Sequence, residues 1–262
     1  EFEVGGDIIQ TKDFTWTSNL NLSHNSGKIL SMWGDGTYIN GNTFDEPGWP
    51  GEASRIQNGA EIGAFYIWKF AGFDEDGNFL LYNKEGEVIP ASEKTDNDKQ
   101  YIGNYLPKVI MGWNNSFRYK NFDLGINMRS WIGFDVYNTF PMYLGIQGQN
   151  GAGQWNLWKP ALEDERYNKI RGVKQLCDYF LEDGSFLKID AITLGYTLSL
   201  KQYTKWADRL RVYGTIGNVA TITGYSGYNP EVDITGWANG VDKVWDCNPI
   251  VRTYTLGIQV SF

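Results

Sequence analysis

Residues 252–262 alternate between large apolar side chains and small or polar ones without a fault. The apolar positions are Tyr254, Leu256, Ile258, Val260 and Phe262. This period of two predicts a β-strand whose two faces meet different surroundings. The length suits a tilted strand that crosses a bilayer, and aromatic side chains open and close the apolar face, as at the two interfaces of a membrane barrel. A soluble sheet with one face on a core gives the same alternation, so this strand alone leaves both structures open.

Strand-like segments recur along the chain and predict nine strands in total. They span residues 1–10, 13–24, 56–73, 78–82, 107–119, 122–134, 186–199, 209–219 and 251–262. In a barrel, one set of side chains should face lipid and the alternate set should face the lumen. The expected lipid-facing residues are Leu194, Tyr196, Leu256 and Ile258, and the expected lumen-facing residues are Thr193, Gly195, Thr255 and Gly257.

The connections between these strands alternate in length. Short ones fall at residues 11–12, 74–77, 120–121 and 200–208, and long ones at 25–55, 83–106, 135–185 and 220–250. Outer-membrane barrels have short turns at one end and long loops at the other, whereas a soluble sandwich has no reason to sort its loops in this way. Within the last-but-one long loop, residues 160–166 predict a helical turn. The pattern therefore favours an all-β transmembrane antiparallel barrel.

An odd number of strands cannot close as a complete bacterial barrel, in which both chain ends lie on the same side. We therefore expect the chain to be a fragment whose preceding strands lie before Glu1, where the sequence already alternates as a strand. In that case residues 1–10 and 251–262 should be the two edges of an open, curved wall, and they should not pair with each other.

Composition narrows the class of protein further. The 262 residues include 11 Trp, 16 Tyr and 14 Phe, and no run of about 18 apolar residues that could form a transmembrane helix. The net charge of −8 makes nucleic acid an unsuitable partner. Acidity and abundant aromatic residues leave membrane barrels and carbohydrate-binding modules as the classes to compare.

Several short motifs, each weak alone, together resemble the C-terminal part of SusC/RagA-like TonB-dependent transporters of the Gram-negative outer membrane. They lie at 102–108 (IGNYLPK), 119–124 (YKNFDL), 135–138 (DVYN), 183–188 (DGSFLK), 193–196 (TLGY), 210–213 (LRVY), 223–231 (TGYSGYNPE) and 252–257 (RTYTLG). The resemblance covers the chain from about residue 1 to its end. It implies that residues 1–262 are the C-terminal part of a 22-stranded barrel whose plug domain and earlier strands are absent here.

The resemblance also implies partners and a location. In that family a SusD-like surface lipoprotein caps the extracellular mouth, the TonB complex acts through the N-terminal part, and the barrel lies in outer-membrane lipid. Glycan or peptide cargo would pass through it, without catalysis and without a cofactor. One departure concerns metal binding. The family often has an Asn-Gly-Asp-Gly segment before the IGN motif, but residues 83–87 read NKEGE here, with Asp96 and Asp98 further on. We therefore predict no metal site.

The remaining polar motifs have structural interpretations. His24, the single histidine, lies at a strand end without an indicated catalytic partner, so we expect a structural or solvated role. Residues 74–77 (DEDG) lack the spacing and the distal Glu of an EF-hand and instead predict a hairpin turn. The acidic run 163–165 predicts a solvated loop face.

Aromatic residues in the long loops are the candidate substrate-binding residues. The six candidates are Trp155, Trp158, Tyr225, Tyr228, Trp237 and Trp245, and Trp33 and Trp49 lie in an earlier loop. Exposed aromatic faces can stack on sugar rings or on peptide side chains. The alternative for each of them is packing of the loops together or against a capping protein.

Two cysteines lie in the last two long loops, which the intervening strands should bring together. Exported proteins tolerate disulfides, so we predict a bridge between Cys177 and Cys247, with two buried thiols as the alternative.

Two functions remain. The first is import of oligosaccharides or peptides across the outer membrane, which the sorted loops, the odd strand number and the terminal aromatic Phe262 favour. The second is a secreted β-rich carbohydrate-binding module with aromatic platforms, which would purify without detergent.

Overall fold

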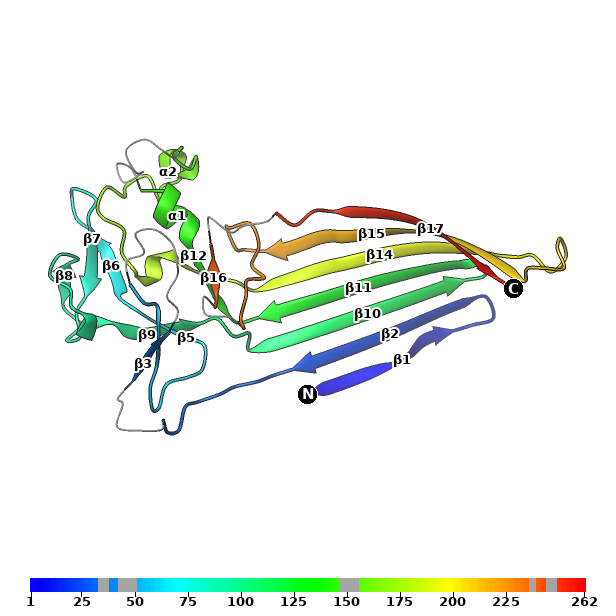
Figure 1. Cartoon of the computed structure of the whole chain (residues 1–262), viewed down its shortest axis with the longest axis horizontal. Coiled ribbons are helices and arrows are strands. Elements are labelled where there is room, and N and C mark those ends of the chain that lie inside the picture. Colours follow the sequence, from blue (N-terminus) through cyan, green and yellow to red (C-terminus); the bar gives the residue numbers. More distant parts are fainter. Residues whose placement is uncertain (33–37, 42–50, 147–155, 236–238, 244–248) are drawn as a thin grey trace.

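The computed structural model describes residues 1–32, 38–41, 51–146, 156–235, 239–243 and 249–262. Figure 1 shows an elongated molecule in two parts. One part is a long antiparallel sheet, which we call the wall. The other, which we call the head, is formed at one end of the wall by the described residues of segments 24–108, 133–185 and 224–252.

The wall contains seven strands in the described part of the chain, and every neighbouring pair is antiparallel. In spatial order they are β1 (Phe2–Gln10), β2 (Phe14–Ser23), β10 (Val109–Tyr119), β11 (Phe122–Ile132), β14 (Phe186–Ser199), β15 (Arg209–Thr223) and β17 (Thr253–Ser261). The edge strands β1 and β17 do not pair with each other. The prediction of an open antiparallel wall is therefore confirmed.

The prediction of nine wall strands is wrong in its number. Residues 56–73 and 78–82 do form strands, but these belong to small sheets of the head. Their largest apolar side chains, such as Phe65, Ile67 and Leu81, are fully buried in the head core, whereas apolar side chains of the wall such as Leu256 remain exposed. The chain leaves the wall after β2 and returns only at β10, and the number of wall strands remains odd.

Connections between wall strands are sorted by end, although the short connection predicted at 74–77 joins β6 and β7 within the head. The short turns after β1, β10 and β14 lie away from the head, and the long excursions after β2, β11 and β15 build the head (Figure 1). At the tightest turn Tyr119 pairs directly with Phe122, so only two residues connect the strands. Such turns require left-handed backbone, which Lys120 adopts at φ 51°.

The head contains three small sheets and four helical segments in the residues that the structure describes. One sheet contains β3 (Ile39–Gly41), β4 (Ser54–Ile56), β5 (Ala64–Ile67) and β9 (Gln100–Asn104). The second contains β6 (Lys69–Phe73), β7 (Phe79–Tyr82) and β8 (Val88–Pro90), and the third β12 (Asp135–Asn138), β13 (Leu181–Asp183) and β16 (Val241–Asp242). The helical segments are α1 (Thr139–Leu144), α2 (Pro160–Glu163), η1 (Asp96–Asp98) and η3 (Asp178–Phe180). The predicted helical turn at 160–166 corresponds to α2.

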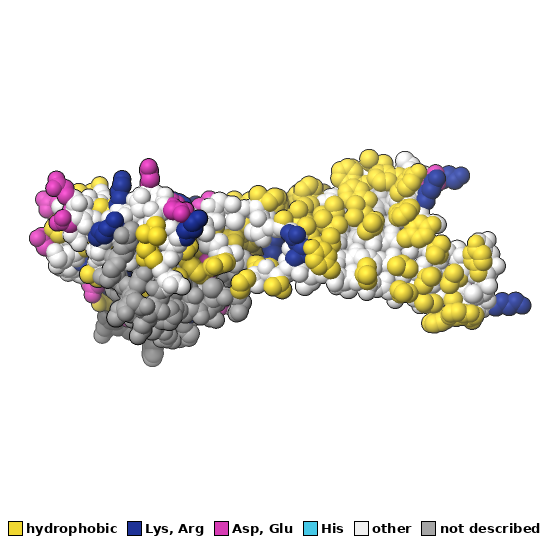
Figure 2. Space-filling model, turned by 90° about the horizontal axis from the view of Figure 1, so that it is seen from above, with side chains coloured by type: hydrophobic (Ala, Val, Ile, Leu, Met, Phe, Trp, Pro, Cys, Tyr) yellow, Lys and Arg dark blue, Asp and Glu magenta, His cyan; other side chains and the backbone are white. Residues whose placement is uncertain are grey.

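The hydrophobic core lies in the head. Its largest fully buried side chains include Phe65, Phe79, Tyr137 and Phe180. A smaller cluster of Phe134, Val136, Phe186 and Tyr225 joins the head to the ends of β11 and β14. The wall has no such core, and Figure 2 shows hydrophobic side chains gathered on its surface instead.

Candidate functional site

The two faces of the wall differ in chemistry. On the outer face, large apolar side chains are fully presented to the surroundings, and the exposed fraction reaches 89% at Leu256 and 72% at Ile258. On the opposite, inner face, Arg211 of β15 forms an ion pair with Asp123 of β11, two strands away. The hydroxyls of Thr193 and Thr215 lie 2.9 Å apart on the same face. The wall is therefore apolar on one side and polar on the other.

Glycines on the inner face make room for these larger side chains. The ring of Tyr213 lies against Gly257, where an added Cβ would overlap the ring atoms. A Cβ on Gly195 would lie 2.6 Å from both Arg211 and Asp123. The guanidinium of Arg211 also lies over the Tyr213 ring, 4.8 Å from its centroid. The predicted lumen-facing glycines thus share a face with the ion pair, as the alternation requires.

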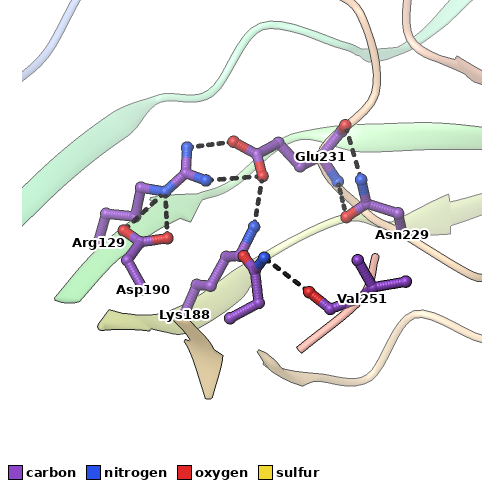
Figure 3. A network of polar contacts seen from close by, with 7 residues as sticks. Arg129, Lys188, Asp190, Asn229, Glu231 and Val251 are labelled. Atoms are coloured by element: carbon purple, nitrogen blue, oxygen red, sulfur yellow. Dashed lines mark hydrogen bonds and ion pairs between the residues drawn. The ribbon is translucent and has the colours of Figure 1, made fainter. Parts of the chain in front are cut away.

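A network of charged residues fastens the last loop to the inner face (Figure 3). Arg129 and Lys188 are direct neighbours on β11 and β14, and both bind the carboxylate of Glu231 from the loop after β15. The Lys188 ammonium lies 3.1 Å from Glu231, and Arg129 also pairs with Asp190 at 2.9 Å. Lys188 is only 4% exposed. Because a buried ammonium needs a compensating anion, Glu231 holds its loop firmly against the wall.

A β-bulge and a loop hydrogen bond orient the side chains of this network. Asp190 is the extra residue of a β-bulge between β11 and β14, which turns its carboxylate toward Arg129. Asn229 accepts the backbone N–H of Glu231 at 3.1 Å and so stiffens the loop two residues before it. Asn218, with φ 52°, lies at the corresponding irregularity of β15 and donates to the carbonyl of Val251 at 2.9 Å.

The same loop is tied to the head at its other side. The phenol of Tyr225 donates to the carboxylate of Asp242 at 2.8 Å. Ser226 donates through both its backbone N–H and its hydroxyl to Glu182, which also accepts from the Asn138 amide. The loop is therefore held by a carboxylate on each side, and residues 227–230 lie between the two attachments.

Burial controls the protonation of Tyr225 and Asp242, which attach the loop to the head. Burial raises the pKa of the Tyr225 phenol, and the neighbouring Asp242 carboxylate raises it further. Burial also raises the pKa of Asp242, although the hydrogen bond from Tyr225 acts in the opposite direction. The phenol therefore remains a neutral donor throughout the physiological range of pH.

A cleft of about 660 Å³ lies where the head meets the wall. Its lining includes Lys108, Asp135, Asp183 and Ser185. Asp135 accepts the backbone N–H of Asn104 at 2.8 Å, and burial raises the pKa of its carboxyl group. The motifs at 102–108, 135–138 and 183–188 are thus brought together here, where they join the head to the wall.

The six predicted substrate-binding aromatics have different environments. Trp155, Trp237 and Trp245 lie outside the described residues, as do Trp33 and Trp49. Trp158 packs on the head core with its ring 5.1 Å from that of Tyr167, and Tyr225 is buried in the junction cluster. Tyr228 differs from both, because it is 64% exposed and contacts only one ring among those that the structure describes, that of Phe140, with 5.0 Å between the two ring centroids.

The remaining sequence candidates have structural roles. His24 Nδ1 lies 2.5 Å from the carbonyl of Lys108, at the end of the wall. Asp74 accepts the backbone N–H groups of Asp76 and Asn78, so residues 74–77 form the predicted turn. Hydrogen bonds from Asn78 lower the pKa of the Asp74 carboxyl group. No group of three or more potential ligands for a metal ion occurs in the described part of the chain.

Cys177 forms no disulfide with the residues that the structure describes, and it is fully buried in the head core. Its backbone lies beside Trp68 in a parallel bridge. The predicted partner, Cys247, lies outside the described residues, so the bridge between them stays a prediction.

Sequence reasoning missed the Glu231 network. Alternation could place Arg129 on the inner face, but strict alternation from Thr193 would have placed Lys188 on the outer face, and only the bulge at Asp190 turns it inward. Nothing in the sequence indicated which loop carboxylate would reach the two cations. The sequence offered no local signal for this contact, because the bulge that aligns the two cations is not visible in the alternation.

No family model matches this chain, but matches with known proteins extend over its whole length. The TonB-dependent receptor P3 of Formosa agariphila is 27% identical over 288 residues, which include all of this chain and 28% of the receptor. The TonB-dependent receptor SusC of Bacteroides thetaiotaomicron is 27% identical over 275 residues, or 26% of its length. The chain therefore spans little more than a quarter of these relatives.

Solved structures agree in fold. The structure of the RagAB peptide transporter matches 99% of this chain and 28% of its own with a TM-score of 0.79 at 22% identity. The closed-closed state of the RagAB peptide importer matches with a TM-score of 0.77 at 23% identity. These relatives are receptors and transporters and not enzymes. The chain is thus similar to the C-terminal portion of SusC/RagA-like TonB-dependent transporters, and its wall has the fold of part of a transmembrane β-barrel.

Proposed function

We propose that this chain forms part of the barrel wall and of the extracellular loops of an outer-membrane importer for oligosaccharides or peptides. The observation that carries the proposal is the wall itself, with apolar side chains on one face, ion pairs on the other, and all long loops at one end. Residues 1–262 belong to one barrel in this view, and the plug and the earlier strands belong to other parts of the transporter. The chain performs no reaction.

The two faces suit the two surroundings of such a barrel. The outer face, with Leu256 and Ile258, lies against the lipid of the Gram-negative outer membrane. The inner face, with Asp123 and Arg211, lines the lumen, where water and other parts of the transporter can satisfy polar groups. The alternative, a secreted carbohydrate-binding module, would leave the whole outer face in water.

The head lies on the extracellular side in this proposal. Among the described candidates, Tyr228 is the aromatic residue best placed to contact cargo, since its ring is exposed and its loop is fixed by Glu231 and Ser226. Trp155, Trp237 and Trp245 remain candidates. The similarity to a peptide transporter, RagAB, supports the peptide class, and the glycan class rests on the family resemblance.

Two partners follow from the same proposal. A SusD-like surface lipoprotein covers the head, and the TonB complex supplies energy through segments outside this chain. The family resemblance supports both, and relatives named TonB-dependent receptors support the second.

Uptake by cells tests the proposal. A strain that lacks the complete transporter should lose uptake of a fluorescent oligosaccharide or of a fluorescent peptide mixture, and the intact gene should restore it. Tyr228→Ala should lower the restored uptake severalfold, whereas Tyr225→Phe should act mainly on folding of the loop. Unchanged uptake of both cargo classes in the deletion strain would refute import, and extraction of the protein without detergent would support the secreted module instead.

A further inference from the structure

The turn between β14 and β15 is the most prominent feature of the end of the wall opposite the head. It runs from residue 200 to residue 208 and projects beyond the neighbouring strand ends (Figure 1). The turns after β1 and β10 contain only residues 11–13 and 120–121. Two large aromatic side chains of the longer turn are mostly exposed, Tyr203 at 72% and Trp206 at 65%. Such a pair on one projecting turn indicates a contact surface.

Hydrogen bonds within the turn fix its backbone. The N–H of Leu200 donates to the carbonyl of Asp208 at 2.9 Å, and the N–H of Tyr203 donates to the carbonyl of Leu200 at 2.8 Å. The Thr204 hydroxyl donates to the carbonyl of Ala207 at 3.1 Å. Because these bonds hold both the base of the turn and its centre, the two aromatic side chains are presented by a backbone that is already fixed.

The turn continues the apolar outer face of the wall. The Trp206 ring lies 6.0 Å from that of Phe262, centroid to centroid. Phe262 follows Leu256 and Ile258 in the alternating apolar series of that face, and it is exposed as they are. Aromatic side chains with one polar end are suited to the level at which the apolar interior of a membrane meets its headgroups. Trp206 therefore lies at the border of the outer face.

Lysines gather at this same end of the wall. The three turns contain four lysines, all exposed, and two aspartates; the lysines are Lys12, Lys120, Lys201 and Lys205. The N–H of Lys120 donates to the carbonyl of Asp13 at 2.8 Å, so the first two turns are in direct contact. The net charge of the whole chain is −8, and Figure 2 shows acidic side chains mostly on the head. The turns, in contrast, suit an anionic partner.

Lys205 is the lysine best placed for such a partner. It directly precedes Trp206 and forms no ion pair with any residue that the structure describes. Lys201, in contrast, lies 3.9 Å from the carboxylate of Asp208. An exposed cation beside an exposed aromatic ring can pair with a charged headgroup while the ring enters the lipid surface.

We propose that the turn of residues 200–208 binds the headgroup of an anionic phospholipid in the membrane leaflet opposite the head. The proposal rests on the import function above, which puts the wall in a membrane, and it adds a lipid partner on one side of that membrane. Lys205 pairs with the negative charge of the lipid, and Trp206 and Tyr203 lie at the level of the headgroups. Binding involves no covalent step.

Native mass spectrometry of the purified complete transporter tests the site with two lipids that share their acyl chains. Dioleoylphosphatidylglycerol carries a net negative charge, whereas dioleoylphosphatidylcholine carries none. A basic residue near a membrane surface contributes about 1 kcal/mol of attraction to anionic lipid, which corresponds to a factor of roughly five in affinity. We therefore expect the wild type to bind the anionic lipid about fivefold more tightly.

Variants assign this preference to the turn. Lys205→Gln should reduce the two affinities to near equality, and Lys201→Gln should have a smaller effect because Asp208 already balances that lysine. Trp206→Ala should weaken the binding of both lipids by a similar factor and leave their ratio unchanged, since the ring contributes apolar contact and no charge.

Lys69→Gln is the matched control, because Lys69 is also exposed beside an aromatic ring, that of Tyr82, but lies in the head. Its lipid preference should equal that of the wild type. Equal affinities for the two lipids in the wild type, an unchanged preference in Lys205→Gln, or an equal loss in Lys69→Gln would each overturn the site. Heat-modifiable migration on gels checks that every variant is folded. None of these results bears on import, which normal uptake by the deletion strain would refute independently.

Discussion

The wall and the head place their hydrophobic side chains in opposite ways. In the wall, Leu256 is 89% exposed and Leu194 55% exposed, whereas Phe65 and Tyr137 in the head are fully buried. Burial from water stabilises the head, as in any soluble domain. The apolar face of the wall requires a surrounding that is itself apolar. The chain thus combines a head that is stabilised in water with a wall whose outer face suits an apolar medium. The two parts meet where β11 and β14 enter the head.

This difference predicts that the two parts respond to different substitutions. The head should be sensitive to cavities in its core and tolerant of polar residues on its surface. The wall should be sensitive to charge on its outer face and tolerant of charge on its inner face. The residues at the junction, Glu231 above all, should affect the head without affecting insertion of the wall.

The largest effect is expected for Phe65→Ala in the head core. Phe65 is fully buried, and its ring contacts Tyr105 and Tyr137 at centroid distances of 5.8 and 6.1 Å. Loss of a buried phenylalanine ring typically costs about 3–5 kcal/mol. Limited proteolysis of the complete transporter should then cut the head much faster, while the barrel still resists unfolding in detergent.

Leu30→Ala is the matched control for this cavity, because Leu30 is 85% exposed and its loss should leave the cleavage rate unchanged. If Phe65→Ala also abolished assembly of the barrel, the head and the wall would not be independent in the way that their burial indicates.

Leu256→Arg should have the next largest effect, this time on the wall. A charge on the lipid face near the bilayer midplane costs about 2–4 kcal/mol in membrane barrels. The neighbouring Thr255→Arg places the same charge on the inner face, beside Thr215. Heat-modifiable migration on gels should show impaired assembly for the first variant and normal assembly for the second, and equal behaviour of the two would contradict the assigned faces.

The parts of the fold that could be predicted from the sequence are those that depend on interactions between residues close together in the chain. The wall strands depend on alternation between adjacent residues, so the predicted segment 186–199 matches β14 and the turn at 120–121 lies where expected. The facing of Leu194 and Leu256 follows from the same local rule. Alternation and the sorted connections favoured a barrel, and the resemblance to a known family then added the expected number of strands in the complete barrel.

The head could not be predicted in the same way because its residues meet partners far along the chain. Residues 64–67 and 79–82 are apolar enough for wall strands, and only their packing against distant parts of the chain in the head core distinguishes them. Trp158 and Tyr225 looked like exposed loop aromatics, but they pack in hydrophobic clusters. Glu231 lies 102 residues from Arg129, and no local pattern connects them.

Glu231→Gln should have a smaller effect, confined to the junction. The substitution removes the anion that compensates the buried Lys188 and the half-buried Arg129. It should lower the free energy of unfolding of the junction by roughly 1–3 kcal/mol, because Arg129 and Glu231 are partly exposed to solvent. We expect the loop around Tyr228 to exchange its amide hydrogens faster while β14 and β15 remain protected. Glu163→Gln is the control, because its pair with Lys159 is exposed and contributes little. Unchanged exchange in the Glu231 variant would show that Tyr225 and Ser226 alone fix the loop.

The smallest effect concerns the pH dependence of head stability through Asp178. Burial raises the pKa of its carboxyl group, while a hydrogen bond from the backbone N–H of Phe70, 2.6 Å long, acts in the opposite direction. A raised folded-state pKa favours the protonated form, so this contribution is complete below the unfolded pKa of about 3.9 and is lost as pH rises through the folded pKa. Asp178→Asn keeps an oxygen acceptor for Phe70 but cannot ionise. The stability of the wild-type head relative to this variant, measured by proteolysis rates, should therefore decrease from pH 4 towards neutrality, and a difference that is constant or grows with pH would show that the ionised carboxylate is stabilised in the fold.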